Sequence, residues 1–362
     1  MSDGLSSATV ENSWFSATFD KAPNQNSPPT CSPSSTSSPA ECTALENTAV
    51  LSRKIKLYPT AEQREKLRQW AGTARFLYNK TVEHLRQPDT KASWMSLKGP
   101  ALAEAPEWAG LVPYQIKSIA IKEACDAVSR AKIKCKKTGD FNQVKFRSRK
   151  SKQSIYIPKS AVIKGGIYKR LLGPIKAAES FDTAKYDCHV VFEYGNWWLC
   201  IPEDKTVSTP RTKACSVSLD PGVRTFQTIY SNEMAGSIGE GAFKRIARLC
   251  LHLDKMTGKA AVARAKSKRN IRKACDRLRF KIDCLKSELH NKTARFLVDS
   301  FDEIVTPEFT AKDFAPRLRR KLKRKTVRAM LNLNHGGFNS ILRRKAAEAG
   351  TRLTVVSEAY SC

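Results

Sequence analysis

The chain has 362 residues, of which 64 are Lys or Arg and 34 are Asp or Glu, so its formal net charge at pH 7 is +30. Apolar residues make up 41% of the sequence, which excludes a wholly disordered chain, and no stretch reaches the roughly 18 apolar residues of a membrane span. A charge of this size repels itself unless a polyanion neutralises it, which favours a nucleic-acid partner over an anionic membrane surface.

The 11 cysteines are scattered, and no two of them have Cys-x-x-Cys spacing. The sequence therefore predicts no zinc ribbon or zinc finger, and the five histidines, which also lack ligand spacing, are given no metal role. The N-terminal residues are rich in Ser and lack the apolar core of a signal peptide. We expect reduced thiols and an intracellular protein, nuclear if the host is eukaryotic.

The first segment, residues 1–48, differs in composition from the rest of the chain. Its first 45 residues contain 11 Ser and 5 Pro, and only Lys21 among them is basic. Such a tract buries too little apolar surface to offset the entropy that is lost on ordering, so we expect a disordered tail.

Apolar residues at alternate positions, followed by helix-capping residues, mark the first ordered elements. The stretch VLSRKIKLYP places Leu51 and Ile55 on one face and ends at Pro59, which predicts a strand. Thr60 and Gln63 have the spacing of a capping box, and apolar residues then recur at helical intervals for about 25 residues.

The remaining elements follow from periodicity, turn residues and charge. The segment from Phe243 to Asp299 is helical in pattern and holds 17 Lys and Arg against 5 acids, which predicts a basic face that tracks phosphates. We expect helices over 112–135, 241–299 and 326–349, a strand-rich stretch over 154–203, a hairpin over 213–232, and strands over 301–309 and 352–360.

Asp220 is the sharpest local feature, because it ends a mostly apolar strand in KACSVSLDPGVRTFQTIYS and is followed by Pro221 and Gly222. This pattern predicts a tight turn and a carboxylate fixed at a strand end. Carboxylate oxygens bind Mg²⁺, and with carboxylates from other strands such a residue makes a two-metal site for attack on a phosphodiester. Asp-Pro-Gly is also common turn chemistry, so a plain turn residue stays open at this point.

Four stretches, in this order along the chain, together resemble one family. The stretch KIKLYPTAEQREKLRQWAGTARFLYNKTVEHL (54–85) resembles the N-terminal signature of the transposon-encoded TnpB proteins and their eukaryotic relatives, the Fanzor proteins. SLDPGVRTF (218–226) resembles the first RuvC motif of that family, and FDEIVTPEFTAKDF (301–314) resembles its second-motif region. NHGGFNSILRRKAAEAGTRLTVVSEAY (334–360) resembles the helix and strand that precede the family's zinc ribbon.

The resemblance implies an RNA-guided DNA endonuclease of a transposable element, which binds a guide RNA made from the transposon end. It implies a multidomain α+β and α/β fold: an N-terminal β-barrel-like wedge domain with an inserted helical recognition domain, then an RNase H-like (RuvC) nuclease domain that lacks its C-terminal end. The implied ranges are 1–48 for the tail, 49–60 and 140–210 for the wedge domain, 61–139 for the helical insert, and 211–362 for the nuclease domain with a basic helical insert over 241–299.

The second carboxylate is displaced relative to the family pattern. Pro307 stands where the second-motif Glu is expected, and Glu308 follows it. Fanzor-like sequences often carry such a Pro and place the Glu on the strand before the ribbon, where this chain has Glu358 in SEAYSC. We therefore favour Glu358 over Glu308 as the partner of Asp220 in catalysis and in binding Mg²⁺, and a Fanzor-like membership.

The family continues with a zinc ribbon and a last motif that carries a third acid, whereas this sequence stops at Cys362. We therefore expect no Zn²⁺ site, an incomplete Mg²⁺ site and a loss of cleavage in residues 1–362. The alternative is a non-catalytic RNA- and DNA-binding remnant of such a protein. A basic ribosomal or chromatin protein explains the charge but neither SLDPGVRTF nor the N-terminal signature.

The predicted nucleic-acid contacts are cations on the first strand and helix, after residue 140, beside Asp220, and in the basic helices and run that follow. We expect a guide RNA and a double-stranded DNA target as partners, no membrane, and a monomer with RNA. The candidates are Lys54, Lys56, Arg75, Lys145, Arg147, Arg149, Lys150, Arg224, Lys268, Arg269, Arg272, Lys273, Arg319, Arg320 and Lys321.

Overall fold

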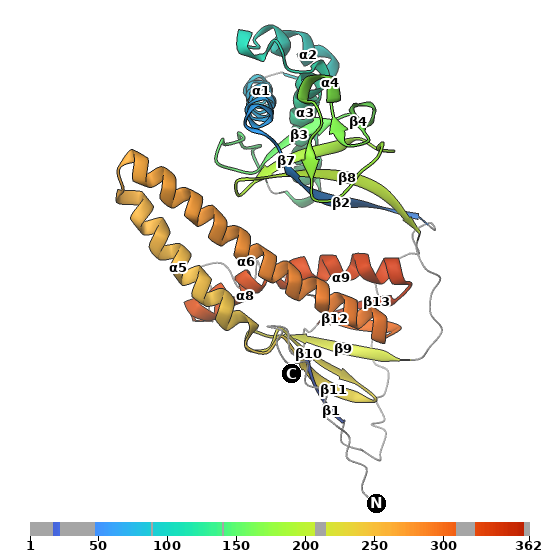
Figure 1. Ribbon diagram of the computed structural model, residues 1–362. Coiled ribbons are helices and arrows are strands. Elements are labelled where there is room, and N and C mark those ends of the chain that lie inside the picture. The colour runs from blue at the N-terminus through green and yellow to red at the C-terminus, as the bar shows by residue number, and fades with distance from the viewer. Residues whose placement is uncertain are drawn as a thin grey trace, which may run out of the picture. The chain divides into compact units, whose positions relative to one another are not determined.

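The computed structural model describes residues 17–21, 48–87, 90–139, 141–206, 215–308 and 323–357. The chain divides into two compact units (Figure 1): an N-terminal unit, residues 50–204, and a C-terminal unit, residues 205–362 together with residues 1–49. Each unit combines a sheet with helices around its own hydrophobic core, which confirms the expected mixture of helix and sheet. No helix in these ranges is both long and apolar enough to cross a bilayer.

The sheet of the N-terminal unit is built from strands that lie far apart in the sequence. Its strands are β2 (Thr48–Tyr58), β3 (Gln153–Ile157), β6 (Lys176–Ala177), β7 (Cys188–Glu193) and β8 (Asn196–Thr206), and a separate pair is formed by β4 (Val162–Ile163) and β5 (Gly166–Ile167). The order in the sheet is β3–β7–β8–β2–β6. Alternate residues of β3, including Ile155 and Ile157, are buried in the core, as the period of a half-buried strand requires.

Helices occupy the chain between β2 and β3. They are α1 (Ala61–His84), α2 (Trp94–Ala103), η1 (Glu107–Ala109) and α3 (Tyr114–Thr138), and the shorter η2 (Lys159–Ala161) and α4 (Lys169–Leu172) follow β3. The predicted capping box is confirmed, because the Gln63 N–H donates to the Thr60 hydroxyl while the Thr60 N–H donates to the Gln63 side chain. Helix α2 was not predicted, since Gly99 and Pro100 inside it are helix-breaking signals.

The sheet of the C-terminal unit mixes antiparallel and parallel strands. It contains β1 (Ala17–Lys21), β9 (Ser216–Pro221), β10 (Gln227–Ser231), β11 (Met234–Ile238), β12 (Glu303–Pro307) and β13 (Arg352–Val356). The order is β1–β11–β10–β9–β12–β13. Neighbours from β1 to β9 are antiparallel, whereas β12 runs parallel to β9 and β13 runs parallel to β12.

Two pairs of helices accompany this sheet. Helices α5 (Ala242–Val262) and α6 (Ala265–Ser300) form a long hairpin that projects beyond the sheet (Figure 1), and α8 (Arg324–Leu333) and α9 (His335–Ala349) connect β12 to β13. Helix α6 packs along α9. The core between them and the sheet contains Val217, Phe226, Ile229, Leu289 and Phe338, which are almost fully buried.

The single helix expected over 326–349 is wrong at Asn334, where the structure has a break between α8 and α9. Asn334 adopts a left-handed backbone conformation with φ of 53° and its side chain accepts a hydrogen bond from the Gly337 N–H at 3.3 Å. Asn tolerates this conformation better than most residues and also caps a helix, so it ends one helix and begins the next.

The expected tail without structure is wrong for residues 17–21, which form β1 and pair antiparallel with β11 from Ala17↔Ile238 to Lys21↔Met234. The physical reason is that the edge of β11 offers unpaired N–H and C=O groups, which a segment of any composition can satisfy. The rest of the tail, 1–16 and 22–47, lies outside the described residues.

Candidate active site and nucleic-acid interface

Asp220 lies at the carboxyl end of β9, which has β10 on one side and β12 on the other. Because β9, β12 and β13 are parallel neighbours, their carboxyl ends meet at one edge of the sheet. Glu308 directly follows β12 at this edge, and its N–H donates to the Val356 carbonyl at the end of β13 at 2.9 Å. The structure thus brings Asp220 and Glu308 to the ends of neighbouring strands.

The Asp220 side chain lies on the exposed face of the sheet. Burial alternates along β9, with Val217 and Leu219 in the core and Asp220 exposed. Within the described part of the chain, neither Asp220 nor Glu308 has an ion pair. Asp220 pairs with Thr228 of β10, and an exposed carboxylate on such a paired backbone is suited to binding a cation without rearrangement.

Glu358 lies outside the described residues, two positions beyond the end of β13 in the sequence. Among the residues that the structure does describe, no three His, Cys, Asp or Glu side chains gather into a possible metal site. The edge therefore supplies two described carboxylates, Asp220 and Glu308.

The turn after Asp220 is wider than the tight turn that Pro221 and Gly222 predict, because β10 begins only at Gln227. The Gly222 N–H donates to the Phe226 carbonyl at 3.4 Å. A Cβ at residue 222 would lie 2.7 Å from the Thr225 carbonyl oxygen, so this close approach of backbone to backbone admits only Gly.

The hairpin of α5 and α6 divides into two regions of different charge. From residue 255 to 275, which we call the acid-free tip, the chain has eight Lys and Arg and no Asp or Glu. These cations are exposed except Lys268, whose Nζ donates to the Ala261 carbonyl at 3.3 Å. The predicted contacts Lys268, Arg269, Arg272 and Lys273 all lie in this tip.

Four of the six cations that follow on α6 are instead paired with acids of the same helix. Their pairs, at 2.5 to 2.9 Å, are Arg279–Asp276, Lys286–Asp283, Lys292–Glu288 and Arg295–Asp299. A shallow cavity of about 320 Å³ lies between the two helices and is lined by Arg245, Arg248, Leu249 and Lys281. Within the described residues of the hairpin, cations that make no ion pair thus lie at the tip and around this cavity.

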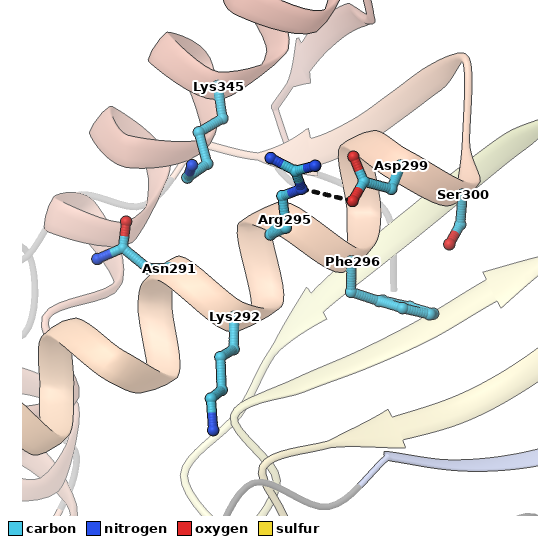
Figure 2. A pocket seen from close by; sticks show the side chains of 7 residues that line it. All are labelled: Asn291, Lys292, Arg295, Phe296, Asp299, Ser300 and Lys345. Atoms are coloured by element: carbon cyan, nitrogen blue, oxygen red, sulfur yellow. Dashed lines mark hydrogen bonds and ion pairs between the residues drawn. The ribbon is translucent and has the colours of Figure 1, made fainter.

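A second depression, of about 560 Å³, is lined by residues of α6 and by Lys345 of α9 (Figure 2). Figure 2 shows Arg295 bound to Asp299 beside it, with the Phe296 ring directed away from Lys345. The depression contains none of the predicted site residues.

Several predicted contacts in the N-terminal unit have partners within the protein. Lys54 pairs with Glu193 and lies over the Trp198 ring, Lys56 lies over Tyr58, Arg75 donates to the Gln153 side chain at 2.9 Å, and Arg147 pairs with Glu123 at 2.8 Å. Burial, followed by the charge of Arg149, lowers the pKa of Arg75.

Lys145, Arg149 and Lys150 are exposed, as is Arg224 in the C-terminal unit. Arg319, Arg320 and Lys321 lie outside the described residues.

Two histidines that the sequence analysis gave no role contact the turn that follows Asp220, residues 222–226. His335 and His290 both stack on Phe226, with ring centres 5.1 and 5.3 Å from it. His335 Nε2 lies 3.1 Å from the Gly222 carbonyl oxygen. The sequence did not predict this arrangement, because a single helix was expected across Asn334. No local pattern indicates what the His335 side chain contacts.

Comparison with known proteins finds one matching family model and similar viral proteins. A family model described as a helix-turn-helix domain, of the OrfB type found in IS605 elements, matches residues 51–87. A candidate transposase of Paramecium bursaria Chlorella virus 1 is 25% identical over 335 residues, which are 85% of this chain and 76% of the viral protein. A candidate transposase of Acanthamoeba polyphaga mimivirus is 28% identical over 162 residues, which are 42% of this chain and 33% of that protein.

These matches support a TnpB/OrfB-type, transposon-associated protein. In this TnpB/OrfB-type chain the matched segment 51–87 forms β2 and α1, so a strand precedes the helix there. Among solved structures the chain is also similar to one from the cryo-EM structure of a Cas12f1–sgRNA–target DNA complex, with 13% identity, a TM-score of 0.46, and coverage of 87% of this chain and 90% of that one.

Proposed function

We propose that this TnpB/OrfB-type chain is the protein part of an RNA-guided DNA endonuclease of a transposable element. The observation that carries the proposal is the sheet edge at which β9, β12 and β13 end, with Asp220 and Glu308 on it. An RNase H-like core is expected to have three antiparallel strands and two further strands parallel to the first of them. Strands β9, β10 and β11 with β12 and β13 follow this order, and β1 is added at the edge of β11. This order supports the assignment of residues 211–362 to a RuvC-like nuclease domain.

The donor set at this edge fits Mg²⁺, because a hard cation takes carboxylate oxygens and the two described carboxylates are exposed without ion pairs. Asp220 and Glu358 would hold the ion, with Glu308 as the alternative to Glu358. Bound Mg²⁺ would make water a stronger nucleophile and offset the charge on the phosphodiester. Asp220 contributes a fixed position, since it pairs with Thr228 of β10 and the ladder between β9 and β12 ends two residues before it, at Ser218.

The acid-free tip supports a nucleic-acid partner. Eight cations without acidic neighbours neutralise phosphates and release their counterions, which drives binding of any nucleic acid. In the proposed complex the guide RNA reads the target by base pairing, and the protein reads backbone shape. In a eukaryotic host the protein would act in the nucleus.

The proposal is tested with residues 1–362 and with the same chain extended by the zinc ribbon and third acid of a relative. Both are expressed with RNA transcribed from the end of the same transposon, and RNA retention and cleavage of guide-matched DNA are measured with Mg²⁺ or EDTA. We expect RNA binding by both chains and Mg²⁺-dependent, guide-dependent cleavage by the extended chain. Asp220→Ala should abolish cleavage and leave RNA binding intact.

Asp283→Ala is the matched control, because Asp283 is a half-buried acid of the same unit that pairs with Lys286 on α6. It should leave cleavage within about twofold of the unsubstituted chain, as for most surface changes. RNA binding without cleavage by either chain would favour the non-catalytic remnant. Failure of both chains to bind RNA would contradict both functions.

A further inference from the structure

His335, the first residue of α9, is a buried side chain with two polar neighbours on the hairpin that carries Asp220. Only 1% of its surface is exposed. Its Nε2 lies 3.1 Å from the Gly222 carbonyl oxygen, and its Nδ1 lies 3.5 Å from the Gln227 side-chain nitrogen. The two contacts span the turn, since Gly222 follows β9 and Gln227 begins β10.

The chemistry of the neighbours fixes the tautomer of the ring. A carbonyl oxygen only accepts, so Nε2 carries the proton and donates it to Gly222. In the neutral ring Nδ1 is then an acceptor, and it faces the amide nitrogen of Gln227, which donates. Burial lowers the pKa of His335 to about 4, although its bond to Gly222 acts in the opposite direction, so the ring is neutral at neutral pH.

The position of the ring is fixed from several sides. Asn334 caps α9 directly before it, and the ring stacks on Phe226 with an interplanar angle of 13°. Phe338, one turn further along α9, meets Phe226 edge-on at 5.1 Å. A side chain held this firmly transmits its position to the group that it binds.

Among the described residues, the turn itself makes three backbone hydrogen bonds. Its Gly222 N–H donates to the Phe226 carbonyl at a long 3.4 Å, its Arg224 carbonyl accepts from the Gly241 N–H at 3.1 Å, and its Phe226 N–H donates to the Ile238 carbonyl at 3.0 Å. The hydrogen bond from His335 therefore links α9 to Gly222, the part of the turn nearest Asp220. Nothing larger than Gly fits at residue 222, so no side chain there can supply a second one.

We propose that His335 is a positioning residue, whose Nε2–H holds the Gly222 carbonyl and thereby the backbone that carries Asp220 at the sheet edge. The consequence for cleavage rests on the proposed function, whereas the order of the turn does not. His335 touches no substrate in this role and acts through Gly222.

The test compares His335→Phe, which keeps a ring on Phe226 but removes the donor, with His335→Gln, whose side-chain N–H has a reach similar to that of Nε2. His290→Phe is the matched control, because His290 also stacks on Phe226 and bonds to the Leu333 carbonyl at 2.8 Å, away from the turn. Hydrogen exchange of residues 219–226 is measured in the protein without RNA, DNA or metal.

We expect exchange in the turn to quicken about tenfold in His335→Phe, the effect of one lost buried hydrogen bond, and to stay near the unsubstituted rate in His335→Gln and His290→Phe. Exchange in β12 should not change. In the chain that cleaves, His335→Phe should slow cleavage about a hundredfold with RNA binding intact, the cost of a misplaced catalytic group. His335→Gln should restore most of the rate.

Equal exchange in the turn of His335→Phe and the unsubstituted chain would overturn the proposal. So would a loosened turn with unchanged cleavage, because Asp220 would then not depend on it. If no chain cleaves, the proposed function fails, and exchange still decides whether His335 orders the turn. If His335→Phe does not fold, His335→Asn makes the same comparison with His335→Gln, since both are neutral amides and only Gln reaches Gly222.

Discussion

The guanidinium of Arg147 lies 3.7 Å from the centre of the Tyr78 ring, and its Nη1 lies 2.8 Å from a carboxylate oxygen of Glu123. Asn79 accepts the Arg147 N–H at 2.7 Å and donates to the Arg147 carbonyl at 3.0 Å. Burial would raise the pKa of Glu123, but hydrogen bonds from His189 and the charge of Arg147 outweigh it and lower that pKa. Arg147 therefore fastens the basic stretch after residue 140 to α1 and α3.

Arg147→Ala should therefore destabilise the N-terminal unit by roughly 1–3 kcal/mol, because a stacked cation and a partly buried ion pair are lost together. Arg147→Lys should recover only part of this, since an ammonium lacks the planar face that stacks. Urea unfolding followed by tryptophan fluorescence measures the change, because Trp70, Trp94, Trp108, Trp197 and Trp198 all lie in this unit.

Lys150→Ala is the control for Arg147, since Lys150 is exposed in the same stretch. It should change the unfolding free energy by less than about 0.5 kcal/mol. Equal stability of Arg147→Ala and Lys150→Ala would show that Arg147 is no structural clamp.

Replacing the acid-free tip cations Lys268, Arg269, Arg272 and Lys273 by Gln should flatten the salt dependence of RNA binding. Each phosphate contact with a single strand contributes about 0.7 to the slope of log K against log salt, so the slope should fall by about 3. The affinity is measured by filter binding or anisotropy between about 50 and 200 mM salt.

The matched control replaces the same number of cations that already have acidic partners on α6: Arg279, Lys286, Lys292 and Arg295. The net charge changes equally, but these side chains neutralise neighbouring acids, so the slope should fall by less than half as much. A similar slope in both variants would mean that overall charge, and not the tip, drives binding.

The roles of the two candidate glutamates can be distinguished in the extended chain, which carries the zinc ribbon and third acid of a relative. Glu358→Ala should abolish cleavage as Asp220→Ala does, and Glu308→Ala should have a smaller effect, because the resemblance favours Glu358 as the second ligand. Cleavage rates at saturating Mg²⁺ provide the measurement, with RNA binding as the control. The reverse pattern would make Glu308, at the end of β12, the ligand.

The C-terminal unit should lose stability as pH falls from about 6.5 to about 4. The pKa of His335 is about 4 in the folded chain against an ordinary value of 6.5, so the unfolded chain binds more protons between these values. His335 thus contributes up to roughly 3 kcal/mol of stability above pH 6.5, which is lost on acidification. Burial also lowers the pKa of His290, which adds to the trend in the same direction.

Urea unfolding at pH 5 and pH 7, followed by hydrogen exchange in β10 and β12, measures this loss. His335→Phe should reduce the difference between the two pH values, because its ring takes up no proton. A pH dependence that is the same with and without His335 would assign the effect to carboxylates instead.

The backbone amides of β1 should be protected from hydrogen exchange, because residues 17–21 pair with β11. A chain that begins at Thr48 lacks β1, so exchange in residues 234–238 should quicken in it while exchange in β9 stays the same. Exchange of 17–21 at the rate of an unstructured peptide would contradict the pairing.

Elements whose signals are local could be predicted from the amino-acid sequence. The capping box at Thr60, the helix that follows it, and the strand that ends near Asp220 depend on neighbouring residues, so periodicity and turn chemistry suffice to predict them. The charge of the basic helices is likewise a local property. The family resemblance rested on short motifs of the same kind.

The cations that remain available and the groups that meet at the Asp220 turn depend instead on long-range packing. Arg147 and Lys150 are both basic residues of one stretch, and distant side chains at Tyr78 and Glu123 give them different roles. His335 lies 113 positions from Gly222, and β1 pairs with a strand more than 200 positions away. Such contacts depend on how the sheet orders its strands, and no local pattern in the chain encodes that order.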